Sequence, residues 1–239
     1  MAEPVDLVHK KYYKKASAPA NCNSFSRFEV KNRLRSCENS STGPDGITYK
    51  GWKSIDPDEV VLTDIFNLCL IFKKVPDNWK ITTTILIFKK GEKSDPGNWR
   101  PISLGNTLYK LYSGCLAKRL NKWILDYDVL SFNQKGFLLY DGVFENNFAL
   151  DYYIRKAKIK KNDMCLASLD ISNAFGSLPH WALFLALKES GAGEAIVDVV
   201  KDCYFGAHTC YKTSKGCSSI RNVKSGGLIQ RMRIVLCGI

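Results

Sequence analysis

The aspartate at position 170 is placed where a carboxylate could hold a divalent metal ion. It follows an apolar run, residues 164–168, that predicts a buried strand, and Pro179 is a good first-turn residue for a following helix. An Asp at the C-terminal end of such a strand is expected to lie in a crevice, and the ring of Phe175 can form one wall of the same pocket. A lone Asp at this position is also a common strand-end cap, so these residues alone leave both interpretations open.

A second group of residues has the chemistry to bind phosphates. Lys89 and Lys90 end a β-branched run, and Arg100 opens the next one within residues 98–104. An arginine offers two parallel N–H groups to a phosphate and a lysine offers a point charge, so both suit the triphosphate of a nucleotide. A basic hairpin without a ligand is the alternative.

Four strings in this chain resemble motifs of reverse transcriptases from non-LTR (LINE-type) retrotransposons. Residues 169–180, Leu-Asp-Ile-Ser-Asn-Ala-Phe-Gly-Ser-Leu-Pro-His, resemble the first catalytic-carboxylate motif of that family. Gly-Pro-Asp-Gly-Ile at residues 43–47 resembles the element upstream of the fingers, Arg-Pro-Ile-Ser-Leu at residues 100–104 resembles the fingers hairpin, and residues 134–137 match a further loop. The motifs follow the family's order from about residue 28 to residue 230, which is nearly the whole chain.

The resemblance implies a metal site for two-metal nucleotidyl transfer. Asp170 would be the catalytic residue and a metal ligand, with the backbone carbonyl of Ile171 as a further ligand. The ring of Phe175 would lie under the sugar and exclude a 2′-hydroxyl. Mg²⁺ would be the cofactor.

The resemblance also implies a dNTP-binding site. Lys89, with Lys90 as the alternative, and Arg100 would close over the triphosphate, and Gln230 would contribute to the same site. Residues 134–137 would shape the fingers. The expected reaction is RNA-directed DNA synthesis, in which an RNA template and a DNA primer are the partners and dNTPs are the substrates.

The second carboxylate motif of the family, Tyr/Phe-x-Asp-Asp, does not occur in this sequence. Residues 226–230 approach the family's Gln-Gly-x-Pro-Leu-Ser-Pro element, but residues 231–235 read Arg-Met-Arg-Ile-Val. We hypothesise that the reading frame shifts after Gln230, which the nucleotide sequence would test. The chain is therefore expected to be an incomplete, inactive fragment of the domain, or alternatively a non-catalytic relic that binds nucleic acid.

Composition agrees with a folded protein that contacts phosphates. The chain has 239 residues, 45% of them hydrophobic, and a formal net charge of +12. Nine cysteines without a Cys-x-x-Cys pair predict reduced thiols and an intracellular location, in the nucleus or the cytoplasm. The apolar runs are too short for a membrane span, so no membrane partner is expected.

Periodicity predicts an α/β (α+β) fold, and the resemblance implies the fingers and a partial palm of a right-hand polymerase, without a thumb. Residues 1–42 would be a basic N-terminal extension with a short helix, residues 43–160 the fingers and residues 161–239 the partial palm. The expected helices span residues 26–35, 59–72, 107–125, 143–158, 179–190 and 194–203, and the expected strands span residues 81–88, 99–104 and 164–168, with a small hairpin in 207–224.

The helix at residues 107–125 is expected to have one apolar and one basic face. Thr107 would cap it, and Lys110, Lys118, Arg119 and Lys122 would form a basic face, for which solvation is the more common state and ligand binding the alternative.

Overall fold

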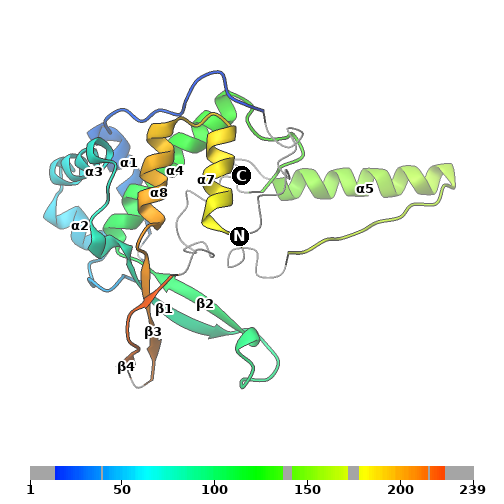
Figure 1. Ribbon diagram of the computed structural model, residues 1–239. Coiled ribbons are helices and arrows are strands. Elements are labelled where there is room, and N and C mark those ends of the chain that lie inside the picture. Colours follow the sequence, from blue (N-terminus) through cyan, green and yellow to red (C-terminus); the bar gives the residue numbers. More distant parts are fainter. Residues whose placement is uncertain (1–13, 39, 137–141, 172–177, 215, 224–239) are drawn as a thin grey trace.

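A small mixed sheet lies below a group of helices, and one long helix, α5, leaves that body (Figure 1). The computed structural model describes residues 14–38, 40–136, 142–171, 178–214 and 216–223. The helices are α1 (Arg27–Arg35), α2 (Tyr49–Ile55), α3 (Val60–Phe72), α4 (Thr107–Asp126), α5 (Gly142–Lys160), α7 (His180–Glu189) and α8 (Glu194–Tyr204). The strands are β1 (Ile81–Phe88), β2 (Trp99–Leu104), β3 (His208–Thr213), β4 (Gly216–Cys217) and β5 (Arg221–Asn222). This mixture of helices and sheet confirms the α/β class.

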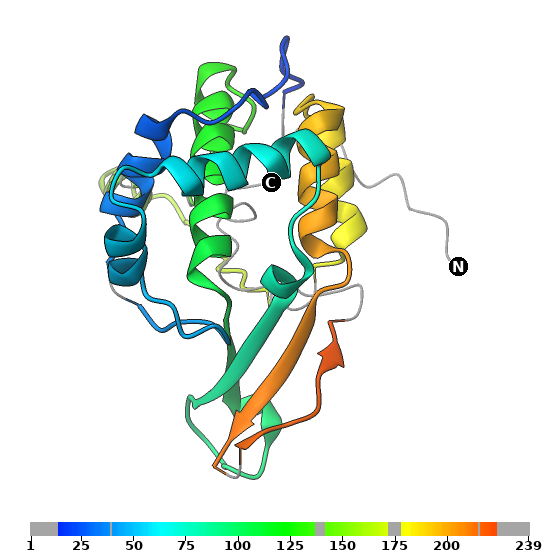
Figure 2. The same ribbon diagram turned by 90° about the vertical axis from the view of Figure 1, so that its left-hand side faces the viewer.

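Strand β1 is the centre of the sheet. It pairs with β2 antiparallel and with β3 parallel, so that Thr84 lies opposite Tyr211 on one side and opposite Ser103 on the other. The buried hydroxyl of Thr84 lies 2.7 Å from that of Thr209 and 3.1 Å from that of Ser103, which ties the three strands together by side chains as well as by backbone. Figure 2 shows β1 and β3 side by side below the helices, although more than a hundred residues separate them.

The helical body is built around a cluster of aromatic rings. The ring centroid of Phe66 on α3 lies 5.4 Å from that of Tyr112 on α4, 6.2 Å from that of Trp79 and 6.3 Å from that of Phe25. All four side chains are buried, and edge-to-face contacts of this kind add to the burial of apolar area. The cluster therefore joins α3, α4 and the segment before α1.

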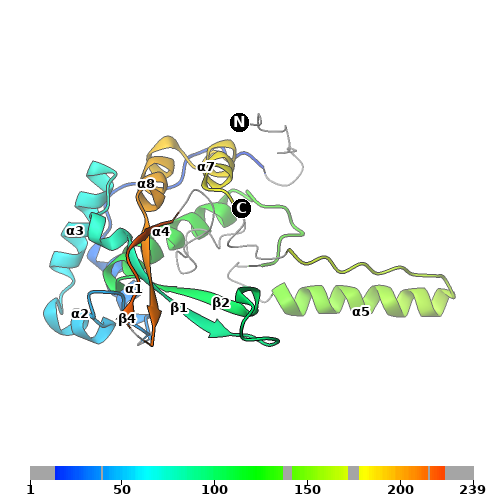
Figure 3. The same ribbon diagram turned by 60° about the horizontal axis from the view of Figure 1, so that its bottom comes forward.

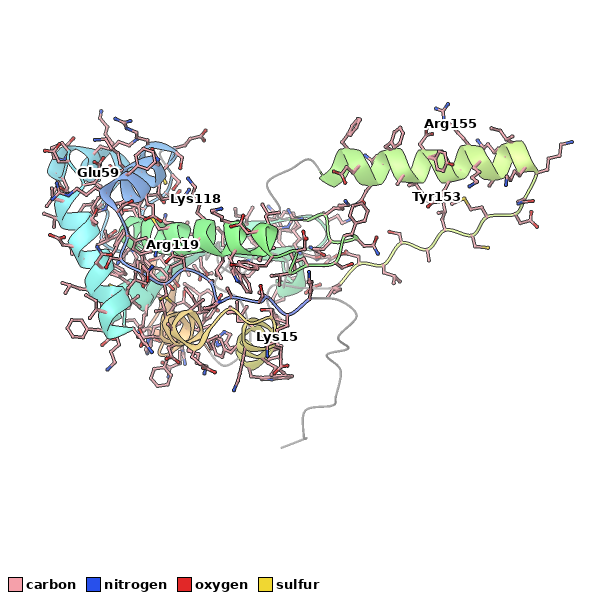
Figure 4. All side chains as sticks on the ribbon, turned by 90° about the horizontal axis from the view of Figure 1, so that it is seen from above. Lys15, Glu59, Lys118, Arg119, Tyr153 and Arg155 are labelled. Carbon is pink, nitrogen blue, oxygen red and sulfur yellow. The ribbon has the colours of Figure 1, made fainter. Side chains whose placement is uncertain are left out.

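The basic face predicted for α4 is wrong at two of its four positions. Lys118 and Lys122 are exposed, but Lys110 and Arg119 are buried (Figure 4). The guanidinium of Arg119 donates to both carboxylate oxygens of Glu29, at 2.8 and 2.9 Å, and Lys110 donates to the carbonyl of Ser41 at 2.8 Å. Both cations are buried because residues distant in sequence accept their hydrogen bonds. Helical periodicity gives no information about such distant partners.

The cap predicted for α4 is also displaced. Asn106 occupies the N-cap position without a side-chain cap hydrogen bond, and Thr107 is the first helical residue. The Thr107 hydroxyl donates to the carbonyl of Ile47 at 2.8 Å and accepts from the indole of Trp52 at 3.0 Å. These bonds attach α4 to the Gly-Pro-Asp-Gly turn, whose Gly46 N–H donates to the Gly43 carbonyl.

Helix α1, which corresponds to the short helix predicted at residues 26–35, begins with a capping box. Ser26 accepts from the Glu29 N–H while Glu29 accepts from the Ser26 N–H. Burial acts to raise the pKa of Glu29, but hydrogen bonds from Arg119 and Ser26 outweigh burial and hold the pKa below its ordinary value. Glu29 therefore stabilises the fold only while it is ionised.

We expect the substitution Glu29→Gln to make the free energy of unfolding depend less on pH in the acid range. A carboxyl whose pKa is lowered by folding contributes stability above its unfolded pKa, and this contribution is lost as the pH falls through the folded pKa. Urea unfolding should show a deficit of about 1 kcal/mol near pH 7, limited by the solvent access of this ion pair, that closes below about pH 4. The substitution Glu38→Gln, at an exposed carboxyl, is the control; an unchanged deficit at all pH values would contradict the linkage.

The strand predicted at residues 164–168 is wrong. Residues 162–171 run back from the end of α5 as an extended segment that pairs with none of the described strands (Figure 1). Leu166 is 60% exposed and Leu169 is 94% exposed. An apolar run has the tendency to form a strand, but its backbone N–H and C=O groups need a neighbouring strand, which local sequence does not provide.

Most other predicted elements are confirmed within a few residues. They are α1, α3, β1, β2, α5, α7, α8 and the β3–β4 hairpin. Helix α2 was not predicted. Among the described residues, every helix is either too short or too polar to cross a bilayer.

Candidate nucleotide-binding site

The register of β1 and β2 places Lys89 and Arg100 on one face of their hairpin. Ile87 lies directly opposite Arg100, and the Lys89 N–H donates to the Asn98 carbonyl at 2.8 Å, which extends the ladder by one pair. Opposed residues of an antiparallel pair share a face, and side chains alternate along a strand. Lys89 and Arg100 are therefore diagonal neighbours, whereas Lys90 lies beyond the ladder, in the bend that follows the strand.

Contacts around the loop hold the two strands together at this point. The rings of Phe88 and Trp99 lie 5.2 Å apart, and the Trp99 indole donates to the Lys93 carbonyl at 3.0 Å. Asn98 donates to the Glu92 carbonyl at 3.0 Å. Figure 3 shows this loop at the end of the hairpin that points away from α2 and α3. The backbone that carries the two cations is thus braced by side chains of the loop.

The cations of the hairpin are exposed and available for a ligand. Within the described part of the chain, Lys89, Lys90 and Arg100 form no ion pair. The nearby Asp95 carboxylate instead accepts from the Gly97 N–H at 2.8 Å. Two unpaired cations on one face can bind an anion that presents several oxygens, such as a triphosphate.

Asp170 does not lie in a crevice, contrary to the sequence prediction. Asp170 and Ile171 lie in the extended segment that follows α5, and both side chains are exposed. The described residues contain no group of three or more His, Cys, Asp or Glu side chains that could hold a metal ion. The register therefore places Lys89 and Arg100 together on one face, and Asp170 is exposed in the segment that follows α5. Phe137, Phe175 and Gln230 lie outside the described residues.

The described residues do not fit a two-metal centre. Mg²⁺ is usually held by one or two carboxylates together with water and phosphate oxygens, and two such ions need more carboxylates than Asp170 provides; the described residues place no cluster of further acidic side chains there. Gln134 and Gly136 lie in a turn, where the Gln134 amide donates to the Gly136 carbonyl at 3.3 Å. This turn is consistent with a shaping role and supplies no metal ligand.

A cavity of about 560 Å³ lies between α7, α8 and the strands, and it contains none of the predicted site residues. Its two aspartates are already paired: Asp198 with Lys73 at 2.8 Å and Asp202 with Lys80 at 3.2 Å. The Asp202 carboxylate also accepts from the Val75 N–H at 2.8 Å. These pairs attach α8 to the segment after α3, so the cavity's carboxylates are structural. The polar stripe of α8 is the sequence signal that could have indicated them.

Comparison with known proteins identifies the family of this chain. Residues 87–230 match the family described as "Reverse transcriptase (RNA-dependent DNA polymerase)". The chain is 34% identical over 191 residues to the "Retrovirus-related Pol polyprotein from type-2 retrotransposable element R2DM" of Drosophila melanogaster, covering 80% of this chain and 17% of that protein. It is 30% identical over 163 residues to an R2 Pol polyprotein of Nasonia vitripennis, covering 68% of this chain and 15% of the relative.

An R2 Pol polyprotein of Bradysia coprophila is 31% identical over 75% of this chain, and the match covers 20% of that protein. The chain therefore spans a fifth or less of the length of each of these three relatives. Reverse transcriptases act on nucleic-acid templates, primers and nucleotides, and they generally depend on divalent metal ions. Because the family match covers more than half of the residues and the relatives are retrotransposon polyproteins, this chain belongs to the reverse transcriptase family, in the branch of non-LTR retrotransposons.

Proposed function

We propose that this chain supplies the fingers and part of the palm of an RNA-directed DNA polymerase. Residues 43–160 are assigned to the fingers and residues 161–239 to the partial palm, with residues 1–42 as a basic extension. The observation that carries the proposal is the shared face of Lys89 and Arg100, two unpaired cations on a braced hairpin inside the family match. The proposed substrates are dNTPs, with an RNA template and a DNA primer.

The two cations have different roles in this proposal. Arg100 presents a planar fork to two phosphate oxygens, and Lys89 provides a compact charge beside it. Because both emerge from paired backbone, they are positioned before the nucleotide arrives, which limits the entropy lost on binding. Lys90 lies in the bend beyond the ladder and is assigned no phosphate contact.

Asp170, with the Ile171 carbonyl, is proposed as a Mg²⁺ ligand, and Phe175 and Gln230 as further nucleotide contacts. The described residues complete no metal site, so no step of the reaction is assigned to the ion here. The alternative function is nucleic-acid binding without catalysis, and the observation behind it is the formal net charge of +12.

The register predicts that Lys89, and not Lys90, contributes to triphosphate binding. We expect Lys89→Gln to weaken the binding of dTTP by roughly 10-fold, the effect of losing one charge-assisted hydrogen bond, and Lys90→Gln to change it by less than about 2-fold. Isothermal titration calorimetry measures both, with dTMP as the ligand that lacks the β- and γ-phosphates. Equal losses for the two variants would contradict the register argument, and RNA binding without any dTTP binding would favour the alternative function.

A further inference from the structure

Helix α3 is apolar on its outer side as well as on the side that faces the core. Leu62 and Phe66 are completely buried, whereas the side chains of Val61, Leu68 and Phe72 are 56%, 50% and 67% exposed. Figure 2 shows α3 crossing the front of the helical body, with its outer side toward the viewer. A helix that is apolar on all sides is normally buried on all sides, so the outer side of α3 indicates an interface.

The apolar residues on the outer side of α3 have the spacing that suits a second helix. Val61, Ile65, Leu68 and Phe72 follow one another at intervals of four, three and four residues. With 3.6 residues per turn, these positions fall within about 60° of one another and form one stripe along the helix. We call these four residues the α3 stripe. Alternating intervals of three and four are those at which the side chains of one helix pack between the side chains of another.

Opposite charges lie beyond the two ends of the α3 stripe. Asp58 precedes α3 and Lys74 follows it; both are exposed, and neither forms an ion pair within the described residues. The neighbouring Lys73 is already paired with Asp198, at 2.8 Å. A helix of 13 residues is about 20 Å long, so the two free charges cannot reach each other within one chain. An antiparallel second helix would place opposite charges side by side, whereas a parallel one would place like charges side by side.

We propose that two copies of this chain associate through their α3 stripes, with the two helices antiparallel. The two-fold axis passes between Ile65 and Leu68, so Ile65 of each protomer packs against Leu68 of its partner. Val61 packs in the same way against the partner's Phe72. The stripe is therefore complementary to itself, and the acidic end of each α3 lies beside the basic end of the other. The antiparallel helix dipoles favour the same arrangement.

The composition of α3 favours a second copy over a nucleic acid as the occupant of this surface. No lysine or arginine occurs within Val60–Phe72, and the exposed side chain next to the stripe is the carboxylate of Asp64, so the surface offers no cation to a phosphate. The net charge of +12 on each copy opposes association, and two helices of 13 residues form less than a standard-size interface. The dimer is therefore expected to be weak, with a dissociation constant on the order of 10 μM.

The apolar contacts are tested by placing carboxylates in the α3 stripe. Sedimentation equilibrium of the unchanged chain at about 1 to 100 μM, without nucleic acid, should show a monomer–dimer equilibrium. The double variant L68E/F72E should weaken the dimer by roughly 30-fold or more, because unpaired charges would be buried in the interface. The control F148E/Y152E changes two exposed aromatic residues of α5 and should dimerise like the unchanged chain. The proposal is overturned if the unchanged chain is monomeric at about 100 μM, or if F148E/Y152E loses dimerisation as strongly as L68E/F72E.

The antiparallel orientation is tested by reversing charges outside the apolar contacts, where the substitutions leave the packing of α3 unchanged. D58K and K74E should each weaken the dimer by roughly 3- to 10-fold, because each places like charges together at both ends of the interface. The double variant D58K/K74E brings opposite charges together again and should recover the affinity of the unchanged chain. Equal dissociation constants for all three variants, the result expected of a parallel pair, would overturn the proposal. A double variant that dimerises no better than the single variants would also overturn it.

Discussion

Replacing Phe66 with Ala is expected to lower the free energy of unfolding by about 3 to 5 kcal/mol. The Phe66 side chain is completely buried, and its ring contacts those of Phe25, Trp79 and Tyr112. Removing it leaves a cavity among three elements that cannot all move inward, so lost burial and the cavity both contribute. Guanidinium unfolding followed by circular dichroism measures the change.

The substitution Tyr112→Phe is the control for this core position. The Tyr112 hydroxyl oxygen is buried and has no hydrogen-bond partner among the residues that the structure describes. Its removal takes away an unpaired polar group while the ring contacts stay, so the stability should change by less than about 1 kcal/mol or should rise. A loss above about 2 kcal/mol would show that the hydroxyl is paired, and a small loss for Phe66→Ala would show that the ring cluster is loosely packed.

Replacing Arg100 with Gln is expected to weaken dTTP binding by roughly 10- to 100-fold, because a charge-assisted bidentate contact with phosphate is lost. The Arg100 side chain is exposed, so the substitution should leave the unfolding midpoint almost unchanged. This separates a binding effect from a folding effect. Calorimetric titration with dTTP and thermal unfolding on the same samples provide both readouts.

A graded series makes the Arg100 result specific. Arg100→Lys keeps the charge and loses the fork, so its affinity should fall between those of the unchanged chain and Arg100→Gln. Arg27→Gln removes an exposed arginine from α1 and should leave dTTP binding unchanged. Equal losses for Arg27→Gln and Arg100→Gln would mean that net charge, and not the hairpin face, determines the affinity.

Elements with local causes were predictable from the sequence. The alternation of apolar and charged residues at 26–35 predicts α1, and the β-branched run at residues 81–88 predicts β1. The parallel pairing of β1 with β3 was not predictable, because its two strands are more than a hundred residues apart and neither carries a register signal for the other. The burial of Arg119 was missed for the same reason, since Glu29 is distant in sequence.

The sequence by itself determined the family, the order of the motifs and the basic hairpin, because residue types and short spacings carry that information. Only the tertiary structure placed Lys89 on the same face as Arg100, because ladder register assigns each side chain to a face. It also decided that Asp170 is exposed. The apolar run before Asp170 is strand-like, but a strand forms only beside a partner, and the described residues place no strand there.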